Sequence, residues 1–163
     1  MTAHLFIERI SARALRNLAH VDFTPGPRFN VISGDNGQGK TSLLEAIYLA
    51  ATSRSFRTSR IIELISHGAS IASSKLVVAQ DEGTHEQSVG LSAAGGARQA
   101  RIEGKRPPSL AAFAVRTPVV VFHPGEVVLS TGSSSERRKL LDRVVLYTAF
   151  SKMGDLVSYT RAM

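Results

Sequence analysis

The strongest hydrophobic pattern in the chain is a short apolar run that leads through a glycine-rich loop to an apolar face at helical spacing. Residues 29–33 read Phe-Asn-Val-Ile-Ser, a largely apolar stretch that predicts a buried strand. After the loop, apolar side chains recur three and four residues apart, which predicts a helix with one apolar face. They are Leu43, Leu44, Ile47 and Tyr48. We therefore expect a strand, a loop and a helix between residues 29 and 51.

Shorter runs predict strands on both sides of that segment. Residues 4–23 predict two strands, and a Thr-Pro-Gly-Pro turn over 24–27 follows them. Residues 69–106 predict a meander of three strands, at 75–80, 85–92 and 98–103. The apolar stretch over 117–122 predicts one more buried strand. The chain is thus predicted to surround one strand–loop–helix unit with additional strands.

Helices are predicted mainly toward the end of the chain. Short helices are expected over 61–66 and from Ser109 to residue 114. Ser133, with Glu136 three residues later, forms a capping box that predicts the start of a longer helix. Residues 155–163 are expected to be helical too, and the chain stops there without a terminating glycine or proline. That ending predicts a truncated chain.

The glycine-rich loop matches the G-x-x-x-x-G-K-[ST] spacing of a P-loop without a mismatch. Its residues are Gly34, Asp35, Asn36, Gly37, Gln38, Gly39, Lys40 and Thr41. Glycines let backbone N–H groups converge on phosphate oxygens, and the start of the following helix adds positive charge. Lys40 is expected to bind the β- and γ-phosphates of ATP, and the Thr41 hydroxyl to coordinate Mg²⁺. The alternative, a glycine-rich turn that binds nothing, is disfavoured by the strand–helix setting.

Two other segments resemble ATPase motifs but fail in detail. Residues 76–82 read Leu-Val-Val-Ala-Gln-Asp-Glu, as a Walker B strand would, yet Gln80 interrupts the apolar run and the acids fall where a hairpin turn is expected. Residues 129–132 resemble the start of an ABC signature motif without its glutamine. We interpret the first as a turn and the second as a loop.

Composition favours a globular protein with a polyanionic partner. The 163 residues carry a net charge of +7 with a pI near 10.4, which indicates a partner such as nucleic acid, although a basic surface without a specific partner stays open. Arg54, Arg57 and Arg60 could contact DNA phosphates or belong to a solvated loop, and Phe56 among them could stack or enter the core. There is no cysteine and no apolar run of membrane-spanning length, which fits a cytoplasmic protein.

The residues also resemble a known family. Residues 34–57 are similar, almost residue for residue, to the P-loop region of RecF, the bacterial DNA replication and repair ATPase family, and residues 15–23 resemble its N-terminal strands. Residues 119–145 are similar to a later RecF segment, from which this chain departs at His123, Ser134 and Leu140.

The resemblance implies a function that the residues alone do not. RecF-like proteins bind single- and double-stranded DNA in an ATP-dependent way, dimerise around ATP, hydrolyse it weakly, and help RecO and RecR load RecA at gaps, in DNA repair and the SOS response. It further implies a nucleotide contact for Arg16, whose alternative is a surface arginine near a strand end. The family's signature motif and Walker B acids lie beyond a chain of this length, so turnover by these 163 residues is not expected.

The predicted fold is an α/β P-loop NTPase of the ABC/SMC-like type, with antiparallel strands flanking the nucleotide-binding core. Residues 1–132 are expected to form the ATPase lobe and residues 133–163 the first helices of a second lobe. Three functions stay open: a DNA-repair ATPase represented by its N-terminal part, a nucleotide- and DNA-binding module without turnover, and another SMC-like ATPase. No membrane partner is expected.

Overall fold

The computed structural model describes residues 5–81, 83–123, 125 and 133–149. Its contacts divide the chain into two units, residues 1–119 and 120–163, and each is described by itself. The domain boundary predicted at residue 132, the signature-like segment over 129–132 and the helix predicted over 155–163 all fall outside the described residues. Among the helices that are described, none has the length and apolarity needed to cross a membrane.

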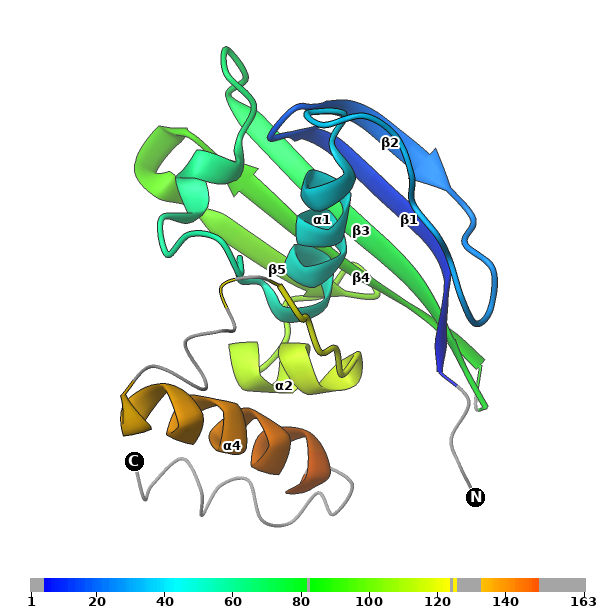
Figure 1. The fold of residues 1–163 in the computed structure, drawn as a ribbon, viewed down its shortest axis with the longest axis vertical. Helices are drawn as coiled ribbons and strands as arrows, with labels where there is room; N and C mark the ends of the chain where they lie inside the picture. Colours follow the sequence, from blue (N-terminus) through cyan, green and yellow to red (C-terminus); the bar gives the residue numbers. More distant parts are fainter. Residues whose placement is uncertain (1–4, 82, 124, 126–132, 150–163) are drawn as a thin grey trace. The chain divides into compact units, whose positions relative to one another are not determined.

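The first unit is built on a five-stranded antiparallel sheet with the strand order β2-β1-β3-β4-β5 (Figure 1). The strands are β1 (Phe6–Leu15), β2 (Leu18–Phe23), β3 (Ile71–Gln80), β4 (Gly83–Ser92) and β5 (Arg98–Ile102). These are the two N-terminal strands and the three-stranded meander that the alternating patterns predict. β1 joins the two groups, because it pairs with β2 on one side and with β3 on the other.

β1 and β2 form a hairpin whose turn consists of Arg16 and Asn17, with Leu15 opposite Leu18. Arg16 has a left-handed backbone (φ 55°), as a tight hairpin turn demands. Its N–H donates to the carbonyl oxygen of Leu64 at 2.7 Å, and its own carbonyl accepts from the Ser66 hydroxyl at 2.7 Å. The turn is therefore anchored to the short 3₁₀ helix η1 (Ile61–Leu64) and the residues after it.

β3 and β4 also form a hairpin, and their pairing ends at Gln80 opposite Gly83. Asp81 lies in the turn between them. The Walker B resemblance of this segment is therefore accidental, as the interruption at Gln80 predicts.

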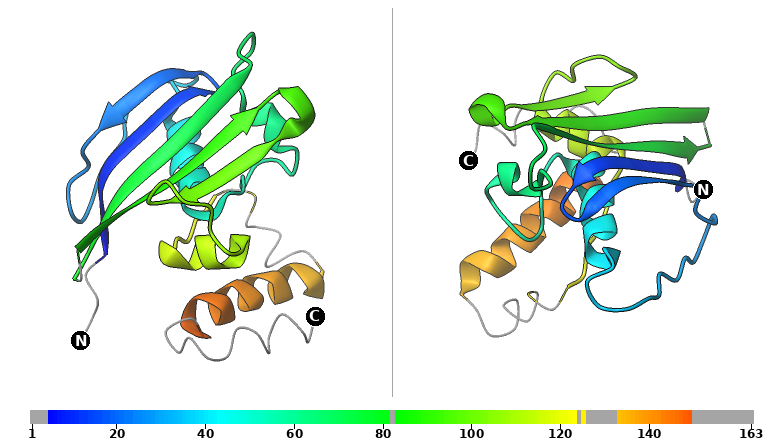
Figure 2. Two further views of the ribbon diagram at one scale, coloured as in Figure 1. Left: turned by 180° about the vertical axis from the view of Figure 1, so that it is seen from behind. Right: turned by 90° about the horizontal axis from the view of Figure 1, so that it is seen from above.

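The helix α1 (Lys40–Thr52) lies against one face of the sheet, as Figures 1 and 2 show. Two clusters of buried side chains form the interface. One contains Ala46 and Leu49 of α1, and the other contains Ala50 and Ala51. Small alanines let the helix approach the strands closely, and the Ser74 hydroxyl of β3 donates to the Ala46 carbonyl at 2.8 Å. This packing fixes the direction in which the start of α1 points.

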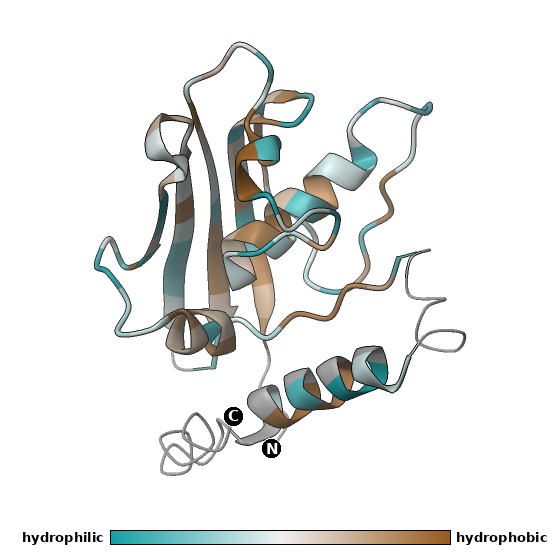
Figure 3. Ribbon diagram, turned by 90° about the vertical axis from the view of Figure 1, so that its left-hand side faces the viewer, coloured by the Kyte–Doolittle hydropathy of each residue, from teal (hydrophilic) through white to brown (hydrophobic). Residues whose placement is uncertain are grey.

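Two predicted strands are absent from the described structure. Residues 29–33 and 117–122 have no strand pairing, and four of their apolar side chains lie largely in solvent. Phe29 is 95% exposed, Val31 93%, Val120 80% and Phe122 89%. Figure 3 shows such hydrophobic stretches of coil outside the sheet and the helices. The prediction of buried strands is wrong here, because neither segment pairs its backbone with a described strand, and a strand needs such pairing to satisfy its N–H and C=O groups.

Two further helices follow the meander. α2 (Leu110–Arg116) begins at Ser109, whose hydroxyl accepts a hydrogen bond from the Ala112 N–H at 3.0 Å, as the predicted cap requires. Its Phe113 is fully buried in the first unit. In the second unit, α4 (Ser134–Ala149) begins directly after Ser133, in agreement with the predicted start.

Candidate nucleotide-binding site

The P-loop spans residues 34–41 and ends on the first turn of α1. Gly37 and Gly39 adopt positive φ angles of 84° and 96°. A Cβ on Gly39 would lie 2.7 Å from Leu18 Cδ2, which is closer than side-chain carbons approach one another. Both the backbone conformation and the close approach to β2 therefore require glycine at position 39.

Lys40 folds back over the loop. Its Nζ donates to the carbonyl oxygens of Gly34 and Asp35, each at 2.7 Å. A second contact within the loop joins the Gln38 N–H to the Asp35 carbonyl at 3.4 Å. The ammonium group is thus held at the N-terminal end of α1, where the helix dipole also favours an anion.

A cavity of about 460 Å³ opens beside this loop. The predicted site residues that line it are Asn36, Gly37, Gly39, Lys40, Thr41 and Arg16. Arg57, which was predicted to contact DNA, lines it as well, together with Asn17 and Ser42. Gly34, Asp35 and Gln38 do not line the cavity but shape the loop around it. The cavity is therefore lined by the lysine, two hydroxyl side chains and two arginines.

One residue at the cavity, Thr41, offers an oxygen atom of the kind that binds a magnesium ion. Thr41 offers a hydroxyl oxygen at the first turn of α1, and hard cations such as Mg²⁺ prefer oxygen ligands. Among the described residues that line the cavity, none is a carboxylate. Thr41 can thus supply one oxygen ligand of Mg²⁺.

Asn17 is a site residue that the sequence analysis missed. Its Nδ2 donates to the Gly37 carbonyl at 2.6 Å, and its Oδ1 accepts from the Ser42 hydroxyl at 2.7 Å. One side chain of the β1–β2 turn therefore ties the P-loop to the first turn of α1. Its place beside Arg16 in the hairpin turn was the only signal in the sequence.

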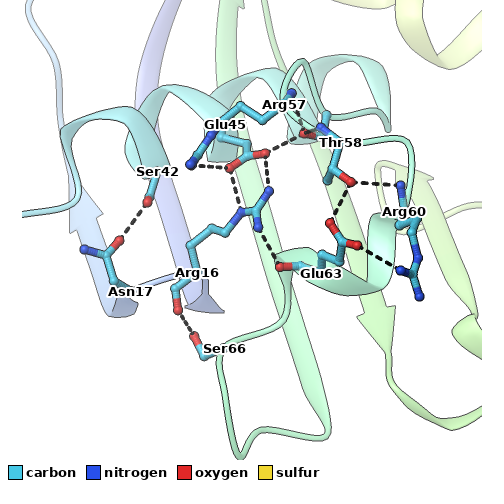
Figure 4. Close-up of polar contacts among 10 residues, drawn as sticks. Arg16, Asn17, Ser42, Glu45, Arg57, Thr58, Arg60, Glu63 and Ser66 are labelled. Atoms are coloured by element: carbon cyan, nitrogen blue, oxygen red, sulfur yellow. Dashed lines mark hydrogen bonds and ion pairs between the residues drawn. The ribbon is translucent and has the colours of Figure 1, made fainter. Parts of the chain in front are cut away.

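Arg16 lies at the cavity, and most of its donors are already engaged (Figure 4). Its Nε and Nη2 donate to the two carboxylate oxygens of Glu45 at 2.9 and 3.0 Å, and its Nη1 donates to the Glu63 carbonyl at 2.9 Å. The hydrogen bonds and charge of Glu45 raise the pKa of Arg16 above its ordinary value, despite partial burial. The turn places this residue at the cavity beside the P-loop, and its contact with a nucleotide stays a prediction.

The three arginines after α1 occupy different environments. Arg57 lines the cavity beside the P-loop and donates from Nη1 to Glu45 at 3.2 Å. Arg60 forms an exposed ion pair with Glu63 at 3.4 Å, and Arg54 is exposed. Phe56, which could stack on a base or enter the core, lies edge-to-face against Tyr48 with ring centroids 5.6 Å apart. The DNA contacts expected of the three arginines stay a prediction.

Glu45 is the second residue that the sequence analysis missed. It lies on α1 one turn after Thr41, and its side chain is fully buried. Burial by itself would raise the pKa of this carboxyl. The hydrogen bonds from Arg16 and Ser55 and the charges of Arg16 and Arg57 outweigh that cost, so the pKa lies below its usual value. Glu45 is therefore ionised and bonded to both arginines of the cavity.

Known proteins with similar sequences belong to a family of P-loop proteins. Residues 6–106 match the family model described as the RecF/RecN/SMC N terminal domain. A protein of Anaeromyxobacter sp. (strain Fw109-5) named "DNA replication and repair protein RecF" is 37% identical over 155 residues, which cover 94% of this chain and 41% of that protein. A protein of the same name from Geobacter sp. (strain M21) is 39% identical, over 84% of this chain and 37% of its own. The chain thus spans about two fifths of the length of these relatives.

Solved structures give the same result. A structure titled "Structure of the recombination mediator protein RecF-ATP in RecFOR pathway" superimposes with a TM-score of 0.82 at 26% identity, over 98% of this chain and 44% of that one. A structure titled "Structural biochemistry of ATP-driven dimerization and DNA stimulated activation of SMC ATPases" superimposes with a TM-score of 0.67 over 85% of this chain and 99% of that one. The identity is 20%, so this similarity shows the shared fold alone. The fold is therefore that of an α/β P-loop NTPase of the SMC-like type, as predicted.

Three observations lead to one assignment. The chain has a P-loop before a helix that packs on an antiparallel sheet, an arginine in the β1–β2 turn beside that loop, and a family model that matches most of its length. The chain belongs to the RecF/RecN/SMC N-terminal domain family.

Proposed function

We propose that this chain binds Mg-ATP in the cavity beside the P-loop. The observation that carries the proposal is the convergence of Lys40, Thr41 and Arg16 on one cavity at the start of α1. Lys40 now donates to two loop carbonyls, and the same ammonium would turn to the β- and γ-phosphates. Thr41 would hold the magnesium ion, which neutralises phosphate charge when bound. The ATP complex of the similar RecF structure supports the choice of nucleotide.

We further propose that the protein acts in DNA replication and repair. The names of its relatives and the net charge of +7 support this role. In this proposal it binds single- and double-stranded DNA in an ATP-dependent way and dimerises around ATP. It would help load RecA at gaps together with RecO and RecR, in the cytoplasm and as part of the response to DNA damage. Arg54, Arg57 and Arg60 would contribute contacts to phosphates that do not depend on base sequence.

A second candidate function is a nucleotide- and DNA-binding module without turnover. It is favoured because no carboxylate is found among the described residues that line the cavity. Hydrolysis needs a metal held from more than one side and an attacking water that is oriented. Phosphate release by the 163-residue chain, with and without DNA, distinguishes the two. Release above that of a Lys40→Ala variant would favour the ATPase, and release equal to it would favour the module.

Calorimetric titration with Mg-ATP tests the binding proposal directly. We expect saturable binding of one nucleotide per chain, competition by ADP, and weaker binding when EDTA removes magnesium. Omitting magnesium should weaken binding because Thr41 then has no ion to hold. A flat titration at high protein concentration would contradict the proposal.

A further inference from the structure

One buried carboxylate holds both arginines of the nucleotide cavity. Glu45 accepts hydrogen bonds from Arg16 in the β1–β2 turn and from Ser55 and Arg57 in the segment after α1. Its side chain is completely buried, whereas those of Arg16 and Arg57 are 21% and 43% exposed. The network therefore has a buried anion and two cations that line the cavity. Figure 4 shows the contacts that join Glu45 to Arg16 and Arg57.

The charges at this point favour an additional anion. Two guanidinium groups face one carboxylate, so the group carries a net charge of +1 beside the P-loop. Arginine has five N–H donors, and Arg57 gives only one of them to Glu45. The remaining donors of Arg57 have the planar geometry that suits phosphate oxygens.

The backbone around Arg57 depends on the same carboxylate. The Ser55 hydroxyl donates to Glu45 and accepts from the N–H groups of Arg57 and Thr58 at 2.9 and 3.1 Å. Both the side chain and the peptide of Arg57 are thus tied to Glu45. Arg16 has an independent backbone anchor, through its N–H to Leu64. Loss of the carboxylate should therefore displace Arg57 more than Arg16.

We propose that Glu45 is a positioning residue for the nucleotide, which holds the guanidinium groups of Arg16 and Arg57 where they meet the phosphates. This inference rests on the proposed binding of Mg-ATP at the P-loop. Glu45 does not touch the nucleotide itself, because it is absent from the residues that line the cavity. Its effect on binding passes through the arginines.

A double-mutant cycle separates this role from a purely structural one. Affinity for Mg-ATP is measured by calorimetry for the full chain and for Glu45→Gln, Arg57→Ala and the double variant. Glu45→Gln keeps the size of the side chain but removes its charge. We expect it to weaken binding by about tenfold, as for the loss of one hydrogen bond to a charged group. In the Arg57→Ala background the same change should weaken binding by about threefold or less, since only Arg16 is left to displace.

Two matched variants complete the experiment. Glu86→Gln removes an acid that pairs with Lys75 on the sheet, outside the cavity lining, and it should bind Mg-ATP as the parent does. Ser55→Ala keeps the side chains of Glu45 and both arginines but removes the hydroxyl that accepts from the Arg57 N–H. It should lower the affinity for Mg-ATP, as Glu45→Gln does. Ser55→Ala decides the matter if Glu45→Gln fails to fold.

The outcomes are distinct. An equal loss from Glu45→Gln in both backgrounds, or parent-like binding by a folded Glu45→Gln or Ser55→Ala variant, would overturn the positioning role while the P-loop proposal stands. Absence of Mg-ATP binding by the parent would overturn the proposed function, and this inference with it.

Discussion

The helix α1 and the segment 29–33 lie on either side of the same loop and both carry apolar side chains, yet only those of α1 are largely buried. In α1, Ala46, Leu49, Ala50 and Ala51 have no exposed surface. In the segment before the loop, Phe29 and Val31 are more than nine-tenths exposed. A helix satisfies its own backbone and needs only an apolar face to pack against, whereas a strand needs a neighbouring strand as well. Hydrophobicity therefore predicts burial only where backbone partners are also present.

The two sides of α1 also differ in how far their side chains are buried. The side toward the sheet is covered by β1, β3 and β4. On another side, Leu44 is 46% exposed and lines an apolar cavity of about 300 Å³ together with Ile32 and Ile47. The P-loop is thus held in place by the packing of the sheet-facing side of α1.

The largest expected effect is a loss of stability from truncation of the packed helix. Leu49→Ala removes a fully buried side chain from the core cluster and should cost about 2–5 kcal/mol in the free energy of unfolding. Val31→Ala, on the exposed segment, should change it by less than about 0.5 kcal/mol. Urea denaturation followed by circular dichroism measures both. Equal losses would mean that residues 29–33 are packed after all.

The next effect concerns the loop that joins the two regions. Gly39→Ala forces a side chain against Leu18 and into a left-handed conformation, and should cost about 1–3 kcal/mol. Gly37→Ala meets no atom within 4 Å, so only its backbone strain remains and the cost should be smaller. Thermal unfolding of the two variants gives the ranking. A reversed order would show that the P-loop packs differently against β2.

DNA binding should separate Arg57, which lines the cavity beside the P-loop, from Arg54 and Arg60. A variant with Arg54, Arg57 and Arg60 all replaced by alanine should bind DNA more weakly, and the slope of log affinity against log salt should fall by about one for each phosphate that the variant no longer neutralises. A variant with only Arg54 and Arg60 replaced should show most of that change, because Arg57 is held by Glu45. An unchanged slope in the triple variant would assign all three to a solvated loop.

A smaller effect is the response of the packed region to acid. The pKa of Glu45 is lowered in the folded chain, so its contribution to stability is present above the unfolded-state pKa of a glutamate, about 4.3, and is lost as the pH falls through the folded value. The parent should therefore lose stability below that pH more steeply than Glu45→Gln. Denaturation midpoints between pH 3 and pH 6, roughly spanning that window, test this. Parallel curves would show that the carboxylate does not titrate with folding.

Local patterns predicted the parts of this molecule that depend on local chemistry. The P-loop spacing identified the loop and the start of α1, and the break at Gln80 identified a hairpin turn instead of a Walker B strand. The contacts of Glu45 with Arg16 and Arg57 were not predictable, because the partners lie far apart in the sequence. Arg16 is separated from Glu45 by 29 positions and Arg57 by 12. The strand predicted over residues 29–33 is wrong for the opposite reason, since the sequence carries a strand signal but the segment pairs with no described strand.

The central claim is that Lys40 binds the phosphates of ATP, and one pair of variants tests it most directly. Lys75 carries the same charge on the sheet, where its Nζ pairs with Glu86 at 3.0 Å and lies outside the cavity lining. Calorimetry should show that Lys40→Ala lowers the affinity for Mg-ATP by at least about a hundredfold, the scale of two hydrogen bonds to a charged group, while Lys75→Ala binds as the parent does. Equal affinities for Lys40→Ala and the parent, with both chains folded, would contradict the account.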